Sequence, residues 1–439
     1  MRGGLVATMD DERRVLTDGA VLAVDGTIVA VDEWAALAGE GEEIDLRDHV
    51  LLPGLVDAHV HLTGPSLFPG LEPDESPLSD HFPRWVMPAH VHSTPEDERA
   101  AARLVALQML RAGTTAFMEA GVCRFPDAVL DALADMPIRG AIGTWAADAW
   151  EWPPELAATT DDAVTRIDAA LALQTNGLVE VRPNLIGHTG CSDELVLAAA
   201  QRARAAGTTW TLHMSAFPDD GAGYRERVGL DPLVHLDRLG ALDAHAVVSH
   251  AIHLSDAEVE VLRTRRATVA YCPGASVRLA TGVTRVGRHD ELEHVALGTD
   301  TQNASNHLEL LRAAATACQV YAERRGTRSV TAATALTWST RGGARALGWE
   351  DRIGSLQPGK RADIVAIDPR QPVRNVEAAL VHGSPQVRHV WVDGRPALLD
   401  GRVHGEEAIL ADAHLAGERV AARADLPGAT GWLCDYRTS

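Results

Sequence analysis

The sequence predicts an α/β protein in which a (β/α)8 TIM barrel is combined with a small β-sandwich domain built from both chain ends. Three observations predict this fold. The 439 residues exceed one ordinary domain but match a barrel of about 250 residues plus a smaller module. Strand-like and helix-like segments alternate along the middle of the chain, as in a parallel α/β sheet. Both ends instead contain short β-rich runs separated by turns.

The two chain ends have the composition of paired strands. Ala20–Val24 and Thr27–Val31 flank Asp25-Gly26, and an Asp-Gly pair between two β-rich runs indicates a hairpin. Ala362–Ile367 and Val387–Val392 have the same texture near the other end. Neither end alone has enough strands to bury a face, so we expect them to pair. The predicted domains are therefore 1–53 plus 356–439, and 54–355.

Eight strand-like runs occupy the middle of the chain. They are Leu55–Leu62, Thr114–Ala120, Ile138–Trp145, Val179–Gly187, Thr209–Ser215, Ala246–Ile252, Thr268–Cys272 and Val295–Asp300. Helix-like segments lie between most of them. One example, Asp193–Ala206, begins with an acidic residue and is followed by Gly207, as helix boundaries favour. Because barrel active sites lie at the carboxyl ends of the strands, the residues there are the first functional candidates.

Composition limits the kinds of molecule that we expect this protein to bind. A formal net charge of −21 argues against nucleic acid, whose binding relies on clustered basic residues. No stretch approaches the roughly 18 apolar residues of a membrane span, and the first residues lack a secretory signal. The five cysteines include no C-x-x-C pair, which predicts reduced thiols. We expect a cytoplasmic protein that acts on a small molecule, with no membrane partner.

Histidines and one aspartate occupy the predicted strand ends. His59 and His61 alternate along the first strand, so both imidazoles project from the same face. Further candidates at the ends of other strands are His188, His213, His250 and Asp300. Imidazoles with a carboxylate suit a borderline divalent ion such as zinc, and iron, cobalt or manganese can use the same set. The sequence therefore predicts a metal site at the mouth of the barrel.

Several motifs together resemble a known family. In chain order they are Pro53-Gly54-Leu55-Val56-Asp57-Ala58-His59-Val60-His61, Ala112-Gly113-Thr114-Thr115, Leu212-His213-Met214-Ser215, Ser249-His250-Ala251-Ile252-His253, Leu297-Gly298-Thr299-Asp300 and Gly354-Ser355-Leu356-Gln357-Pro358-Gly359-Lys360. The chain is similar to the amidohydrolase superfamily, and within it to the branch of triazine hydrolases, guanine deaminase, and adenosine and S-adenosylhomocysteine deaminases.

The resemblance implies a role for each candidate. The implied ligands of one divalent ion are His59, His61, His213 and Asp300. Asp300 would also take a proton from water and pass it to the leaving group, while His250 would stand beside that water or the substrate. His188 would contact substrate. The only lysine, Lys360, lies in the last of these motifs, far from the others in the sequence, which agrees with the mononuclear members of the superfamily. A homodimer is the family's habit.

One position departs from the resemblance. Deaminases of this branch commonly have Glu three residues after the fifth-strand histidine, where it passes a proton to a ring nitrogen, whereas this chain has Ala216. Either Asp219 or Asp220 in the following loop replaces that acid, or the substrate needs no ring protonation.

The predicted function is hydrolysis of a C–N bond in a small molecule by metal-activated water, with deamination of a purine, pyrimidine or s-triazine ring as the leading reaction. The alternative that Ala216 leaves open is hydrolysis of amide, urea, carbamate or halogenated substrates. A noncatalytic metal-binding scaffold is a minor alternative. Trp85, in the long first loop, is a candidate substrate contact, and Trp145, Trp150 and Trp152 could add to an aromatic wall for a flat heterocycle.

Overall fold

The computed structural model describes residues 1–149, 152–175, 177–282 and 288–426. Within them, eight parallel strands form two four-stranded sheets. The first has the order β5(Leu55–Val60), β6(Thr114–Glu119), β7(Arg139–Ile142), β8(Val179–Val181). The second has the order β12(Val295–Leu297), β11(Thr268–Tyr271), β10(Ala246–His250), β9(Trp210–Met214). The α/β class is therefore confirmed.

Hydrogen bonds connect the two parallel sheets at both edges. Val60, at the end of β5, forms a parallel bridge with Asp300, which follows β12. At the opposite edge the Leu185 N–H, beyond β8, donates to the Thr211 carbonyl in β9 at 2.9 Å. The strand order and these two links bring the carboxyl ends of β5, β9, β10 and β12 toward one another.

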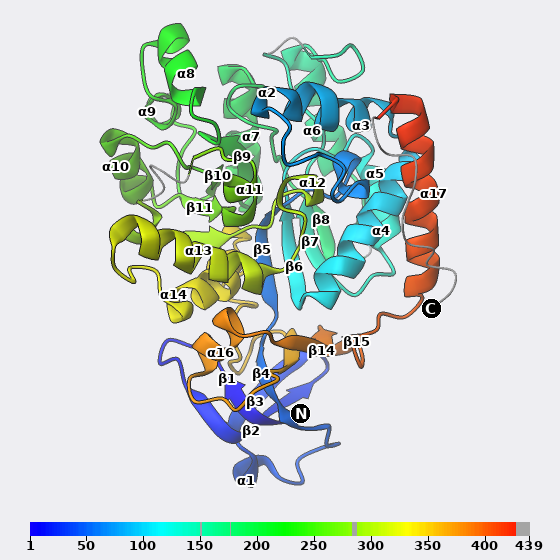
Figure 1. Cartoon of the computed structure of the whole chain (residues 1–439), viewed down its shortest axis with the longest axis vertical. Helices are drawn as coiled ribbons and strands as arrows, with labels where there is room; N and C mark the ends of the chain where they lie inside the picture. The colour runs from blue at the N-terminus through cyan, green and yellow to red at the C-terminus, as the bar shows by residue number, and fades with distance from the viewer. Residues whose placement is uncertain (150–151, 176, 283–287, 427–439) are drawn as a thin grey trace.

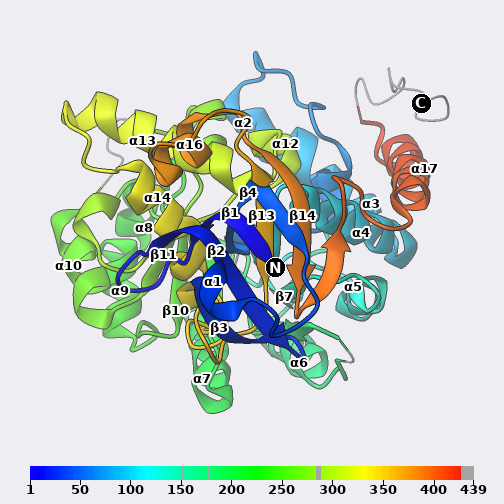
Figure 2. The same ribbon diagram turned by 90° about the horizontal axis from the view of Figure 1, so that it is seen from below.

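Helices lie outside these strands (Figures 1 and 2). The longer ones are α4(Pro95–Arg111), α5(Pro126–Leu133), α6(Thr160–Leu171), α7(Asp193–Ala206), α8(Asp220–Val228), α9(Pro232–Arg238), α10(Asp256–Arg265) and α13(Leu310–Arg325). The shorter ones are α2(Leu78–Asp80), α3(Met87–His92), α11(Pro273–Arg278), α12(Gln302–Ser305), α14(Ala332–Thr337) and α15(Gly343–Ala346). The prediction for α7 is confirmed, because the Ser192 hydroxyl accepts from Leu195 N–H at its start and Gly207 ends it at φ 65°.

Both chain ends contribute to a third sheet, below the others in Figure 1. Its order is β15(Arg395–Leu398), β14(Gln386–Val392), β13(Ile364–Asp368), β4(Asp45–Pro53), β1(Arg2–Ala7), β2(Val15–Val24), β3(Thr27–Glu33). The short helices α1(Trp34–Leu37) and α16(Val376–His382) accompany this part of the chain. The predicted pairing of the two ends is confirmed, since β4 bonds to β1 on one edge and to β13 on the other.

The predicted sandwich of two facing sheets is not what these strands form. They make one continuous seven-stranded sheet, because β4 joins the strands of both ends directly. The sheet curls until its edge strand β3 reaches the segment before β13, where Ile28 N–H donates to the Lys360 carbonyl at 2.8 Å. A single curled sheet therefore encloses an apolar cluster that includes Ile28, Leu51 and Trp391.

The C-terminal helix also departs from the predicted division at 356–439. α17(Glu406–Ala424) packs along α4, beside the parallel strands rather than on the seven-stranded sheet (Figure 1). Ala416 and Val420 of α17 are buried in one cluster with Ala101 of α4. Arg419 also forms an ion pair with the buried Asp97 at 2.9 Å.

A buried ion pair joins the seven-stranded sheet to the parallel strands. Arg139, at the start of β7, donates to both carboxylate oxygens of Asp363, at 2.7 and 3.2 Å, and to Asp393 at 2.6 Å.

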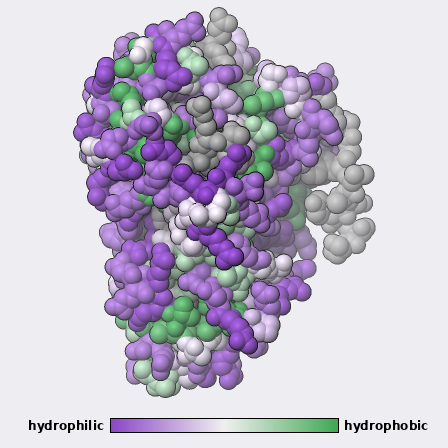
Figure 3. All heavy atoms as spheres, turned by 60° about the vertical axis from the view of Figure 1, so that its left-hand side comes forward, coloured by the Kyte–Doolittle hydropathy of each residue, from purple (hydrophilic) through white to green (hydrophobic). Residues whose placement is uncertain are grey.

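Hydrophilic residues cover most of the face in Figure 3. Among the helices of the described residues, none has the length and apolar character needed to cross a membrane.

Candidate metal centre

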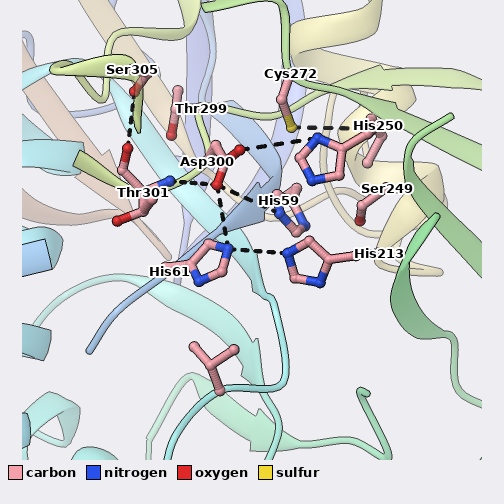
Figure 4. A network of polar contacts seen from close by, with 12 residues as sticks. His59, His61, His213, Ser249, His250, Cys272, Thr299, Asp300, Thr301 and Ser305 are labelled. Carbon is pink, nitrogen blue, oxygen red and sulfur yellow. Dashed lines mark hydrogen bonds and ion pairs between the residues drawn. The ribbon is translucent and has the colours of Figure 1, made fainter. Parts of the chain in front are cut away.

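Four histidines and one aspartate meet at the carboxyl ends of the parallel strands (Figure 4). The Nε2 atoms of His61 and His213 are 3.2 Å apart. Oδ1 of Asp300 lies 3.3 Å from His61 Nε2 and 3.9 Å from His59 Nε2, and Oδ2 lies 4.0 Å from His250 Nδ1. The structure therefore brings these five predicted residues together from β5, β9, β10 and the end of β12.

The backbone at two of these residues has an unusual conformation. His250 has φ 67° and Asp300 has φ 65°, in the left-handed region that non-glycine residues rarely adopt. Such a conformation costs free energy and persists only where the surroundings hold it. At both positions, the end of β10 and the segment after β12, the side chain turns toward the cluster (Figure 4).

Asp57 fixes the positions of His59 and Thr299 by hydrogen bonds, a role that sequence reasoning missed. Its side chain is fully buried. Oδ1 accepts from the N–H groups of His59 and Thr299, each at 3.1 Å, and Oδ2 accepts from the Thr299 hydroxyl at 2.5 Å. Asp57 thus links the strand that carries His59 to the residue before Asp300. A charged residue in the otherwise apolar run of β5 was the signal for this role.

The imidazoles are held in the neutral form. Burial, followed by the charges of neighbouring histidines, keeps the pKa of His59 and of His61 well below its usual range. Burial likewise lowers the pKa of His213 to about 3 and that of His250 to about 4. Burial raises the pKa of Asp300. Metal binding requires neutral imidazole, so the site favours the ligand form of these side chains.

The donor set fits a divalent ion. Two ligand atoms that each lie about 2.0–2.1 Å from a zinc ion are about 3.0–3.4 Å apart, which matches the His61–His213 separation. Neither ring nitrogen of the buried His59 has a hydrogen-bond partner among the described residues. Buried polar atoms without a partner are costly, and coordination would satisfy one of them.

Cys272 lies close to the cluster and was not predicted as part of it. Its sulfur is within 4.8 Å of potential ligand atoms of both His59 and Asp300. Burial, with the charges of Asp300 and Asp57, holds the pKa of this thiol well above its usual range. Because the thiolate is the ligand form of cysteine, a protonated Cys272 is a poor ligand. Lys360 is also outside the site, since its Nζ donates to Glu350 O, Ile353 O and Ser355 Oγ.

A cavity of about 600 Å³ opens onto the cluster. His61, His188, His213, His250 and Asp300 all line it. The Nδ1 atom of His188 lies 3.1 Å from the His213 carbonyl, to which it donates, and its Nε2 has no partner among the described residues. Nε2 is therefore free to accept a hydrogen bond in the cavity.

The tryptophans predicted as substrate contacts differ in whether they line the cavity. Trp145 and Trp152 line the cavity, with ring centroids 5.3 Å apart, whereas Trp150 lies outside the described residues. Trp85, predicted as a substrate contact, is not among the residues that line the cavity. It belongs to the π-helix His81–Val86, whose first and last residues face the cavity. Trp85 is buried, at 4% exposure, and the Arg84 guanidinium carbon lies 5.2 Å from the centroid of its ring.

The position of the missing acid also faces the cavity. Ala216 lines it, as do Asp219 and Asp220 at the start of α8. Asp219 is exposed, while Asp220 is half-buried and accepts from Phe217 N–H at 3.0 Å.

Comparisons with known proteins agree with this geometry. The model of the amidohydrolase family matches residues 50–397. The chain is 29% identical to a 5-methylthioadenosine/S-adenosylhomocysteine deaminase of Syntrophobacter fumaroxidans over 412 residues, covering 91% of this chain and 92% of that protein. A zinc-bound adenosine deaminase structure from Xanthomonas campestris aligns with a TM-score of 0.86 and 26% identity, covering 96% and 98%. Zinc-bound atrazine chlorohydrolase from Arthrobacter aurescens aligns with a TM-score of 0.82 and 22% identity, covering 94% and 98%, and so shares the fold.

Proposed function

The chain belongs to the amidohydrolase family, as a metal-dependent hydrolase of C–N bonds, and we propose that it deaminates the six-membered ring of an adenine nucleoside. The observation that carries the proposal is the convergence of three neutral imidazoles, one carboxylate and His250 at one end of a cavity. The substrate class is supported by the names of the relatives and by a cavity of about 600 Å³, a size that accommodates small molecules.

In this proposal His59, His61, His213 and Asp300 hold one divalent ion, with zinc as the metal. The 3.2 Å separation of two ligand nitrogens and the unpartnered ring of His59 support the assignment. When bound, the ion supplies Lewis acidity that lowers the pKa of water toward about 7.

Asp300 and His250 supply the proton chemistry. Asp300 removes a proton from the attacking water and delivers it to the departing amine, a task favoured by the burial that raises its pKa. Neutral His250, 4.0 Å from Asp300, orients the water by a hydrogen bond. The left-handed backbone at both residues directs the two side chains toward the same point.

The substrate lies against the wall opposite this pair. His188 accepts a hydrogen bond from it through Nε2, since Nδ1 is already engaged with the His213 carbonyl. Trp145 and Trp152 contribute apolar surface for the base.

The strand order and the links between the two parallel sheets support a proposal for the architecture. The eight parallel strands form a closed (β/α)8 barrel over residues 54–355, with α17 as an added helix. Residues 1–53 and 356–405 form the second domain. We further propose a cytoplasmic homodimer, and light scattering of the purified chain tests its mass.

Ala216 favours a second candidate function. A substrate that needs no ring protonation, such as an amide, urea, carbamate or aryl halide, would be hydrolysed without an acid at this position. The two candidates differ in product, because only deamination of a ring amine releases ammonia from a heterocycle.

The test measures ammonia release by the zinc-loaded chain from adenosine, 5-methylthioadenosine, S-adenosylhomocysteine, guanine, cytosine and melamine. We expect turnover of at least one adenine nucleoside and its loss in His213→Ala. Hydrolysis of urea-type or halogenated compounds, with no ammonia from any heterocycle, would replace the first function with the second.

A further inference from the structure

The proposed deamination lacks an assigned acid for the ring nitrogen. Ala216 faces the cavity but carries no proton. Water addition to a C=N bond places a pair of electrons on that nitrogen, which must be protonated for the addition to be favourable. Among the residues lining the cavity, a side chain other than those of the metal cluster has to supply the proton.

His81 lines the cavity and is hydrogen-bonded to a carboxylate that does not belong to the metal cluster. Its Nδ1 lies 2.6 Å from Oε2 of Glu72. Both side chains are buried, at 5% exposure for His81 and 4% for Glu72. His81 lines the cavity, whereas Glu72 is not among the residues that line it. Nδ1–H donates to the carboxylate, so Nε2 is the nitrogen left to face a substrate.

The pair is anchored to the part of the fold that carries Asp300. Arg278, at the end of α11, donates to the Glu72 carbonyl at 2.7 Å and to the carbonyls of Asn303 and Ala304 at 2.6 and 3.2 Å. Asn303 lies three residues after Asp300.

The other candidates are less suited to donating a proton. His188 already donates through Nδ1 to the His213 carbonyl, which leaves Nε2 as an acceptor. Burial lowers the pKa of His90 to about 3, so it stays neutral. Asp219 is exposed to water, and Asp220 accepts from the Phe217 N–H within its own turn.

We infer that His81 is the catalytic acid for the ring nitrogen and that Glu72 is its positioning residue, so that this pair replaces the carboxyl absent at Ala216. The inference rests on the proposed function. Glu72 orients the ring through Nδ1 and stabilises the imidazolium, as a carboxylate does for any histidine whose other nitrogen donates.

The proton balance closes over one turnover. The water oxygen bonds to the ring carbon, one water proton goes to Asp300, and the C=N electron pair moves to the ring nitrogen, which takes a proton from Nε2 of His81. The carbon–amine bond then breaks with its electron pair on nitrogen, which takes the proton from Asp300 and leaves as ammonia. The remaining hydroxyl proton returns to His81 as the C=O bond forms.

The test uses the full-length zinc-loaded chain and its best ammonia-releasing substrate. His81→Ala is expected to lower kcat by about 10²–10⁴-fold with KM changed less than about threefold. Added imidazole is expected to restore at least tenfold of this loss, relative to wild type at the same imidazole concentration. Glu72→Gln should give an intermediate loss, and His92→Ala, an exposed histidine on the same segment, is the matched control.

Metal content and melting temperature are measured for each variant, with His81→Gln as a second replacement that keeps a polar side chain. A folded, metal-loaded His81→Ala with wild-type kcat would overturn the inference, as would a loss that imidazole does not restore. If Asp219→Asn or Asp220→Asn lost most of its kcat while His81→Ala kept the wild-type kcat, the acid would be assigned to that loop instead. Absence of ammonia release by wild type would remove the proposed function itself, a result distinct from all of these.

Discussion

Replacing Asp57 by alanine removes three hydrogen bonds that hold the metal-cluster strand to the segment before Asp300. The N–H groups of His59 and Thr299 and the Thr299 hydroxyl would be left buried without their acceptor. Each buried unsatisfied group costs about 1–3 kcal/mol, so the variant, with three such groups, should lose roughly 3–9 kcal/mol of unfolding free energy. With an unfolding entropy of about 2.1 cal/mol/K per residue, the melting temperature should fall by roughly 3–10 °C if the chain unfolds as one unit.

Calorimetry of the zinc-loaded chain measures this shift, and metal analysis of the same samples reports whether the ligands stay in place. Asp57→Asn is the matched control, because its side-chain oxygen can still accept from both backbone N–H groups. It should lose less stability than Asp57→Ala. A melting temperature and metal content unchanged in Asp57→Ala would refute the reasoning that this carboxylate positions His59 and Asp300.

Three further predictions concern other parts of the molecule. Arg139→Leu leaves the buried Asp363 without its ion-pair partner and should lower the unfolding free energy measured with denaturant by about 3–5 kcal/mol. Arg47→Leu, which removes an exposed ion pair, should change that free energy little. Equal effects of the two substitutions would contradict the importance of burial. Removing the metal with a chelator should abolish ammonia release and lower the melting temperature, and added zinc should restore both; activity that survives complete metal removal would exclude the mechanism. His188→Ala should raise KM about tenfold with metal content unchanged, and an unaltered KM would remove it from the substrate site.

The metal cluster was largely predictable because its signal is local. His59 and His61 are two residues apart in one strand, and strand geometry alone places both on one face. His213 and Asp300 followed from a barrel's rule that strand ends converge, together with the family resemblance. The structure brings all of them within a few ångströms of one another.

Other features depended on contacts that no local pattern encodes. Trp85 lies in a helix that is wound i→i+5, a winding that the sequence pattern does not reveal and that changes which residues share a face. α17 was assigned to the β-domain by its position in the chain, yet its apolar face packs on α4. The Glu72–His81 contact joins a loop residue to the first residue of the π-helix, nine positions later. Neither helical nor strand periodicity reveals such a contact.

The central claim is that His59, His61, His213 and Asp300 hold one ion required for hydrolysis. Its most direct test is elemental analysis combined with an ammonia-release assay on wild type, His213→Ala and Asp300→Asn. We expect one divalent ion per wild-type chain, and loss of both bound metal and turnover in His213→Ala and Asp300→Asn. Full metal content and full turnover in both variants would contradict the claim.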